Sequence, residues 1–336
     1  VEGFSWGVLA GAFVGNFLLQ LWAVRRVGMR YRPVFDLRHP DLRKYVFLTL
    51  PLMVGLTMMF SIEIFIRFFG SFLPEGGIAA LNYGRTVLLI PVGLFGQAVG
   101  VASFPFMARL VAEHRLAEMN QLLNRTLRYL ALVIPISVLM MVLRHELVRI
   151  LFQRGRFDAD AAALTVEVLI YMLPGAFALS AYTVVVRGFH AMQNTMFPAV
   201  FGTIAVSLSL PLYWFGTLHL GAGGTAAAVS LSSILQVSLL YALWNRRSQN
   251  RQSGSVYRFY VKIGWISIAV GLLLESVRRN LIDVTALGDG FWSSIWISLA
   301  VGAAFVGVMT LAAVVFRIQE VTDVGGKLLG KFRKRD

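Results

Sequence analysis

The chain has 336 residues, of which 57% are hydrophobic and 14% are charged. Soluble domains are roughly 45–50% apolar and about 25% charged, so this composition excludes an ordinary soluble domain and a disordered chain. The 31 Lys and Arg exceed the 17 Asp and Glu by 14, and the absence of Cys excludes disulfides, a thiolate zinc site and a cysteine nucleophile. An excess of Lys and Arg suggests nucleic-acid binding in a soluble protein. In this apolar chain, the positions of the Lys and Arg relative to the apolar runs have to be known before the excess is interpreted.

Long apolar runs predict nine membrane-spanning helices, because a bilayer core requires about 20 predominantly apolar residues per helix. In chain order, the expected spans are 3–24, 45–70, 77–108, 129–143, 161–186, two spans within the uncharged stretch 195–245, 259–274 and 291–316. The turn at His219–Gly224 divides the uncharged stretch. Residues 144–157 carry too much charge to cross, and we expect them to form an amphipathic segment at the membrane interface. The predicted fold class is an all-α polytopic membrane protein.

The basic residues are distributed unequally between the two sides of these spans. When the connections alternate between sides, 23 of the Lys and Arg, including Arg187, fall on one side and six on the other, while Arg67 and Arg85 lie inside spans. The positive-inside rule makes the richer side cytoplasmic, and the C-terminus lies there. The first helix then starts outside and has no signal-peptide features, so we expect an odd number of crossings before Val1.

Small residues inside the spans indicate close helix packing. Gly96 and Gly100 are one helical turn apart, and this spacing lets helix backbones approach each other in lipid. We therefore expect both glycines to contact a neighbouring helix.

Ionisable side chains inside the spans are the candidate binding residues, because such groups usually face a cavity or a partner. Glu63 and Arg67 are four residues apart in the order that favours an ion pair on one helix; alternatively, Arg67 reaches the interface by snorkelling. Arg85 lies in a polar cluster with no acid on its own helix. Its expected partner is a bound anion or Glu63. The cluster comprises Asn82, Tyr83, Arg85 and Thr86.

No arrangement typical of catalysis or cofactor binding occurs in the sequence. The five His have no His or Glu companion at metal-binding spacing, and there is no G-x-S-x-G elbow, P-loop or dinucleotide fingerprint. We expect Asp158 and Asp160 to cap a helix. The sequence thus predicts no enzyme, no metal and no cofactor, and any transport would be driven by an ion gradient or the membrane potential.

Three stretches carry a family resemblance. They are SFLPEGGIAALNYGRTVLLIPVGLFGQAVG from Ser71, LFQRGRF at 151–157 and VVRGFHAMQNTMFPAV at 185–200. They resemble the seventh-to-eighth helix region, the interfacial motif and the tenth-helix exit of the bacterial lipid II flippase MurJ (MviN) family, in the multidrug/oligosaccharidyl-lipid/polysaccharide exporter superfamily. The interfacial motif contains Phe152, Gln153, Arg154 and Gly155, and the cytoplasmic turn after the tenth helix contains Gln193, Asn194, Thr195 and Pro198.

The resemblance implies a two-lobe transporter of fourteen helices, of which this chain would supply the sixth to fourteenth. Residues 1–44 would hold the last helix of the N-terminal lobe and a basic linker, 45–246 the C-terminal six-helix lobe, and 247–336 two more helices, which form a groove for a lipid tail, and a basic tail. The implied activity is translocation of lipid-linked peptidoglycan precursor across the bacterial inner membrane by alternating access, for cell-wall biosynthesis.

The implied partners are a polyprenyl-diphosphate-linked glycan and membrane lipids, with no nucleic acid and with the coupling ion or potential left open. Arginine suits such a substrate because its guanidinium binds phosphates bidentately. By the resemblance, Arg67, Glu63, Arg85, Asn82, Tyr83 and Thr86 would line the substrate cavity.

The sequence departs from the family pattern at several cavity positions. Family members typically have Tyr-Ala-Asp-Arg where this chain has Tyr83-Gly84-Arg85-Thr86, so the family's cavity arginine aligns with Thr86. Ile66 stands where an acid often precedes the arginine, and Ser207 and Pro211 stand at sodium-site positions, so a sodium site is not expected. Two alternatives remain open: another exporter of the superfamily, for polysaccharide-lipids, drugs or cations, and a degenerate paralogue that does not transport.

Overall fold

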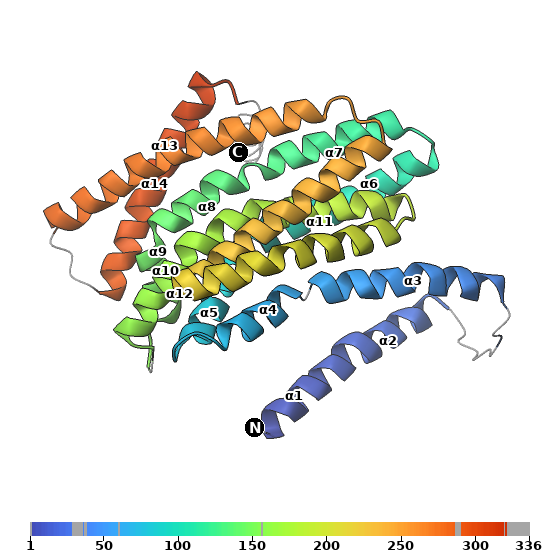
Figure 1. The fold of residues 1–336 in the computed structure, drawn as a ribbon, viewed down its shortest axis with the longest axis horizontal. Helices are drawn as coiled ribbons and strands as arrows, with labels where there is room; N and C mark the ends of the chain where they lie inside the picture. The colour runs from blue at the N-terminus through green and yellow to red at the C-terminus, as the bar shows by residue number, and fades with distance from the viewer. Residues whose placement is uncertain are drawn as a thin grey trace. The chain divides into compact units, whose positions relative to one another are not determined.

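The computed structural model describes residues 2–28, 36, 39–59, 61–155, 157–285, 290–318 and 320, and these residues form helices and turns with no strand (Figure 1). The chain divides into two compact units, Val1–Val46 and Phe47–Asp336, which we describe separately. The all-α membrane fold predicted from the sequence is confirmed. The division at residues 44 and 246 stays a prediction.

The first unit is built on one apolar helix. It consists of α1 (Glu2–Phe13), a π-helical turn η1 (Val14–Leu18) and α2 (Leu19–Arg26). Its residues 5–26 are long and apolar enough to cross a membrane. Helix α3 (Pro40–Met59) begins in this unit and continues into the second.

The second unit holds the remaining helices. In order these are α4 (Ser61–Gly70), α5 (Gly77–Pro91), the π-helical turn η2 (Val92–Gln97), α6 (Ala98–Ala112), α7 (Leu116–Leu130), α8 (Val133–Val142), α9 (Arg144–Phe152), α10 (Ala159–Met172), the 3₁₀ turn η3 (Leu173–Gly175), α11 (Ala176–Ala191), α12 (Met196–Arg247), α13 (Ser253–Thr285) and α14 (Phe291–Val315). The segments α5–η2–α6 and α10–η3–α11 are each continuous, so each makes one long span.

Helix α12 is a hairpin of two spans. Its 52 residues turn at Gly221, where φ is 57° and ψ is −134°, in a left-handed region that glycine adopts without a Cβ clash. Oγ of Ser232 donates to Oγ of Ser209 at 2.9 Å, so the two halves lie side by side and antiparallel. The turn falls within the HLGAGG sequence, as expected.

Among the described residues, seven helical segments are long and apolar enough to span a membrane. That number treats α12 as one segment and leaves out the expected span 45–70, which here is divided into α3 and α4. With these two differences included, the described helices agree with the nine expected spans.

Two boundaries expected from charge are wrong. Helix α7 begins at Leu116, so residues 116–142 form the span and the basic connection expected at 109–128 shrinks to 113–115. Arg128 lies on this helix because its apolar face, including Leu123 and Leu127, packs in the core and holds the helix through the charged positions. Arg187 lies inside α11, which ends at Ala191, and not in a connection.

The core of the second unit depends on close approaches between helices. A Cβ on Gly84 would collide with Cγ1 of Val168, and one on Gly96 would lie 2.7 Å from Cα of Ser180. Helix α5 therefore lies directly against α10, and the turn η2 lies directly against α11. The turn at 71–76 and α9 occupy one end of this bundle, and the α6–α7 connection occupies the other (Figure 1).

Candidate functional site

A partly exposed charge cluster joins α4 to α5. Nη2 of Arg67 donates to Oε1 of Glu63 at 2.8 Å, and Nη2 of Arg85 lies 3.7 Å from Oε2 of the same carboxylate. The predicted pair within one helix is confirmed, and Glu63 is also the partner of Arg85 from the neighbouring helix. The three side chains together carry one excess positive charge. They keep 71% (Arg67), 34% (Glu63) and 29% (Arg85) of their side-chain surface exposed, so the cluster is open to a ligand.

The other predicted residues of α5 fall into two groups. Asn82 and Thr86 are exposed, but Oγ1 of Thr86 donates to the carbonyl of Asn82 at 2.9 Å and so is bonded to the backbone of its own helix. Tyr83 packs against the end of α9, with ring centroids 4.7 Å from Phe152 and 5.1 Å from Phe157. The structure thus places Glu63, Arg67 and Arg85 together and assigns Tyr83 to a packing contact.

The described residues of the LFQRGRF sequence, 151–155 and Phe157, form the end of α9 and part of the turn that follows. Gly155 has φ of +62°, a left-handed conformation that explains why glycine stands there. Oε1 of Gln153 accepts from Nε of Arg149 at 3.2 Å, and the guanidinium of Arg154 lies 5.6 Å from the ring centroid of Phe291 on α14. Asp158 caps α10, as expected, by accepting from the backbone N–H of Ala161 at 2.9 Å. The motif therefore fixes α9 between α5 and α14.

The first turn of α9 enters a buried charge network that the sequence analysis missed. Nε of Arg278 donates to Oε1 of Glu146 at 2.9 Å, and both residues are buried. Arg144 and Arg278 lie 3.3 Å and 3.6 Å from Glu275. A signal was available, since Glu146 and Glu275 are single acids among basic residues at the ends of apolar runs. The network attaches α9 to α13.

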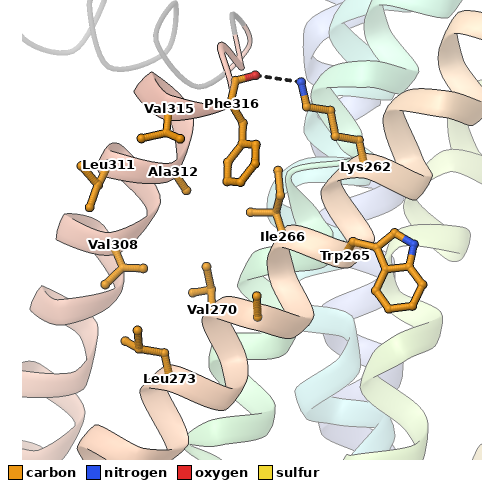
Figure 2. A pocket seen from close by; sticks show the side chains of 11 residues that line it. Lys262, Trp265, Ile266, Val270, Leu273, Val308, Leu311, Ala312, Val315 and Phe316 are labelled. Carbon is orange, nitrogen blue, oxygen red and sulfur yellow. Dashed lines mark hydrogen bonds between the residues drawn. The ribbon is translucent and has the colours of Figure 1, made fainter.

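Helices α13 and α14 enclose an apolar groove of about 590 Å³ (Figure 2). Val270 and Leu273 on α13 face Val308 and Leu311 on α14 across it. At one end, Nζ of Lys262 donates to the carbonyl of Phe316 at 2.7 Å. The full lining is Lys262, Trp265, Ile266, Ala269, Val270, Leu273, Val308, Leu311, Ala312, Val315 and Phe316. The groove occurs between the two helices for which the family resemblance implied one.

The predicted Gln-Asn-Thr-x-x-Pro turn is a connection between α11 and α12. Gln193 has φ of 54°, and Oδ1 of Asn194 accepts from the backbone N–H of Phe197 at 3.2 Å. Oγ1 of Thr195 donates to the carbonyl of Leu48 on α3 at 3.1 Å, and Pro198 is buried in the first turn of α12. All four residues have roles in shaping this turn.

Arg187 is a further ionisable group that the sequence analysis assigned to topology alone. Its Nη2 donates to Oε1 of Gln97 at 2.9 Å, and its Nη1 is buried with no hydrogen-bond partner. A Cβ on Gly100 would overlap Nη1, so the guanidinium lies directly on that glycine. None of the ion pairs found among the described residues includes Arg187.

Metal ligands are not clustered in the part of the chain that the structure describes. It contains no group of three or more His, Cys, Asp or Glu that could hold a metal ion. Ile66 is fully buried in the core, and Ser207 is exposed on α12. Neither Ile66 nor Ser207 is an acid, and for this reason the sequence does not predict a sodium site.

Comparisons with known proteins agree with this architecture. The family model for "Lipid II flippase MurJ" matches residues 1–318. The probable lipid II flippase MurJ of Rhizobium meliloti (strain 1021) is 30% identical over 247 residues, covering 71% of this chain and 44% of that protein. That of Vibrio cholerae is 29% identical over 240 residues, covering 70% and 46%. The chain therefore spans about half the length of the curated relatives it matches.

Solved structures share the fold. A lipid II flippase MurJ in an inward closed conformation has a TM-score of 0.60 and 21% identity, with 90% of this chain and 60% of that chain covered. A transporter of the MOP superfamily from Pyrococcus furiosus has a TM-score of 0.52 and 18% identity, with 79% and 63% covered. At these identities the likeness concerns the fold alone.

Proposed function

Because the chain belongs to the lipid II flippase MurJ family, we propose that it takes part in moving lipid-linked peptidoglycan precursor across the bacterial inner membrane by alternating access. The family match over residues 1–318 carries this proposal. The chain is a multi-pass membrane protein. Its C-terminus would lie in the cytoplasm, on the side with the larger share of Lys and Arg.

The open cluster on α4 and α5 would bind the diphosphate of the substrate. Arginine guanidinium groups bind phosphate oxygens with two parallel hydrogen bonds. Glu63 would hold Arg67 and Arg85 near each other while the substrate is absent. Arg85 would replace the family's cavity arginine from the neighbouring position, because its side chain reaches across to α4. The excess positive charge favours an anionic cargo over the cations carried by other superfamily exporters.

The groove between α13 and α14 would hold the polyprenyl tail. Its walls are almost wholly apolar, so a hydrocarbon chain loses no hydrogen bonds by entering it. Lys262 at one end supplies a cation next to the groove. The substrate would therefore be held in two places, with the tail in the groove and the diphosphate on the cluster.

Rescue of cells depleted of their own lipid II flippase tests the proposal. We expect the full-length gene to restore growth, and Arg85→Ala to abolish rescue by removing a diphosphate contact. Arg109→Ala is the matched control, since Arg109 is exposed and pairs with Glu113 at 2.7 Å at the end of α6. Failure of the correctly inserted wild-type protein to rescue would contradict the proposed function. Raised drug resistance without rescue would favour a drug exporter.

A further inference from the structure

Arg187 has the properties of a ligand-binding cation and not of a topology signal. Resting on the proposed function, we propose that Arg187, held by Gln97, is a second binding site for the diphosphate of the lipid-linked substrate, separate from the α4–α5 cluster. The inference depends on where the guanidinium lies along the span, on its charge balance and on the space around it.

The guanidinium lies deep in the span. Gln97, to which it is bonded, is 12 residues from Arg85 in one direction and 12 from Arg109 in the other, along the continuous helix α5–η2–α6. At 1.5 Å per residue, each separation is about 18 Å, and a bilayer core is about 30 Å thick. Arg187 therefore meets Gln97 near the middle of this helix, although its own Cα is only four residues from the end of α11. A snorkelling side chain would extend toward the interface instead.

The charge of Arg187 has no internal counter-ion. The charge of Glu63 compensates in part for the charges of Arg67 and Arg85. In contrast, no ion pair found among the described residues includes Arg187, whose side chain is hydrogen-bonded to the neutral amide of Gln97. An ionisable residue within a membrane span is a functional candidate whose partner must be named. An anion that arrives with the substrate would be that partner.

The packing around Arg187 leaves space for its guanidinium. Gly96 and Gly100 share one helix face, yet a Cβ on Gly96 would meet the backbone of Ser180, whereas the atoms nearest to one on Gly100 belong to the side chains of Arg187 and Thr183. Gly100 thus makes room for the charged group, while Gly96 serves helix packing. Leu94 and Val101, on either side of Gln97 along the helix, are 66% and 61% exposed, so a ligand can approach this stretch.

A purely structural role would predict a different response to mutation. If the bond between Arg187 and Gln97 only joined α6 to α11, Gln97→Glu would strengthen it by adding an opposite charge, and binding of substrate would not change. If Arg187 binds the diphosphate, the same change supplies an internal anion that competes with the ligand. Gln97→Glu therefore separates the two roles without removing the hydrogen-bonding partner.

The test measures binding of farnesyl diphosphate to the full chain in phosphatidylcholine nanodiscs, with every protein carrying Arg85→Ala so that the diphosphate contact of the α4–α5 cluster is removed. We expect Arg187→Gln and Gln97→Glu each to weaken binding about tenfold or more, the loss typical of a charge-assisted contact. Arg187→Lys should retain part of the affinity. Arg109→Gln is the control and should bind as the chain with Arg85→Ala alone does. Farnesol, which lacks the diphosphate, should bind all variants equally, and the unfolding temperature of Gln97→Glu should not fall.

The outcomes separate the inference from the proposed function. Unchanged affinity in both Arg187→Gln and Gln97→Glu would overturn the inference and leave the proposed function intact. Absence of farnesyl diphosphate binding by the wild-type chain, measured with Arg85 intact, would count against both. Displacement of farnesyl diphosphate by phosphatidylglycerol at equal mole fraction would overturn the assignment to the diphosphate, because the site would then bind any anionic headgroup.

Discussion

Two charge clusters near the same end of the bundle are built from the same residue types and differ in burial. In the α9–α13 network, the side chains of Glu146 and Arg278 are 4% and 10% exposed, whereas Arg67 in the α4–α5 cluster is 71% exposed. The least exposed members of the first network are two acids and two arginines, which balance. The second cluster has one acid for two arginines. Balanced, buried charges position helices; an open cluster with excess charge can bind a ligand.

Helix α9 connects the two regions. Its first turn carries Glu146, which pairs with α13, and its last residue, Phe152, touches Tyr83 on the helix that carries Arg85. The buried network therefore supports one wall of the region that holds the open cluster. Mutations can test whether the two clusters differ as their burial indicates.

The largest effect is expected at the buried network. Glu146→Gln leaves the buried guanidinium of Arg278 with the carboxylate of Glu275 at 3.6 Å and without its 2.9 Å partner, and breaking such a pair costs about 3 kcal/mol of unfolding free energy or more. Glu63→Gln is the matched control, because exposed pairs contribute about 0–1 kcal/mol. Thermal unfolding in detergent measures both. Equal destabilisation by the two variants would remove the distinction between the clusters, and recovery in Glu146→Leu/Arg278→Leu would support it.

A smaller effect is expected at the contact that joins α9 to α5. Tyr83→Ala removes two aromatic contacts and should lower the unfolding free energy by about 1 kcal/mol beyond the lost apolar burial. Tyr83→Phe keeps both rings in contact and should match wild type in unfolding temperature and in the rescue assay. If Tyr83→Phe is as damaging as Tyr83→Ala, the hydroxyl of Tyr83 has a role that the packing contact does not explain.

The smallest effect concerns pH at the buried network. Partial burial lowers the pKa of His145 below its usual 6.5, and the nearby charges of Arg144 and Arg278 lower it further. The unfolded chain then binds a proton more readily than the folded one, so stability decreases as pH falls through about 6.5 and stops decreasing below the folded pKa. Unfolding temperatures measured across this interval should show the decrease in wild type and a smaller one in His145→Gln. An unchanged profile in His145→Gln would place the titrating group elsewhere.

Much of the fold follows from the sequence because lipid leaves the chain few choices. An uncharged run of about 20 residues has to be helical to satisfy its backbone, and the GAGG sequence at 221–224 marked the α12 turn. The spacing of Glu63 and Arg67 predicted an ion pair as one of two alternatives, and the structure shows that pair. Arg85 had two possible partners in the sequence, and tertiary packing of α5 against α4 selected Glu63.

The sequence failed where tertiary packing decides what a charge does. Arg187 near the end of an apolar run has the same local pattern as a snorkelling residue, and its depth depends on Gln97, 90 positions away. Gly96 and Gly100 form one pattern but have different neighbours. The basic residues of α7 suggested a connection between spans in the sequence. They lie on a helix because one face of that helix is buried and the other can carry charges.

The π-helical turn η2 determines the direction in which the second half of the long helix faces. Twelve residues of regular α-helix would rotate Gln97 about 120° away from Arg85. A π-turn accommodates one extra residue, so the twelve residues turn about as far as eleven would, which leaves Gln97 roughly 20° from the direction of Arg85. The wide turn at Val92–Gln97 thus aligns the two positions in azimuth. Deleting one residue there would convert the π-turn into regular α-helix and keep Gln97 in line with Arg85, whereas straightening the turn without a deletion would rotate Gln97 about 120° out of line.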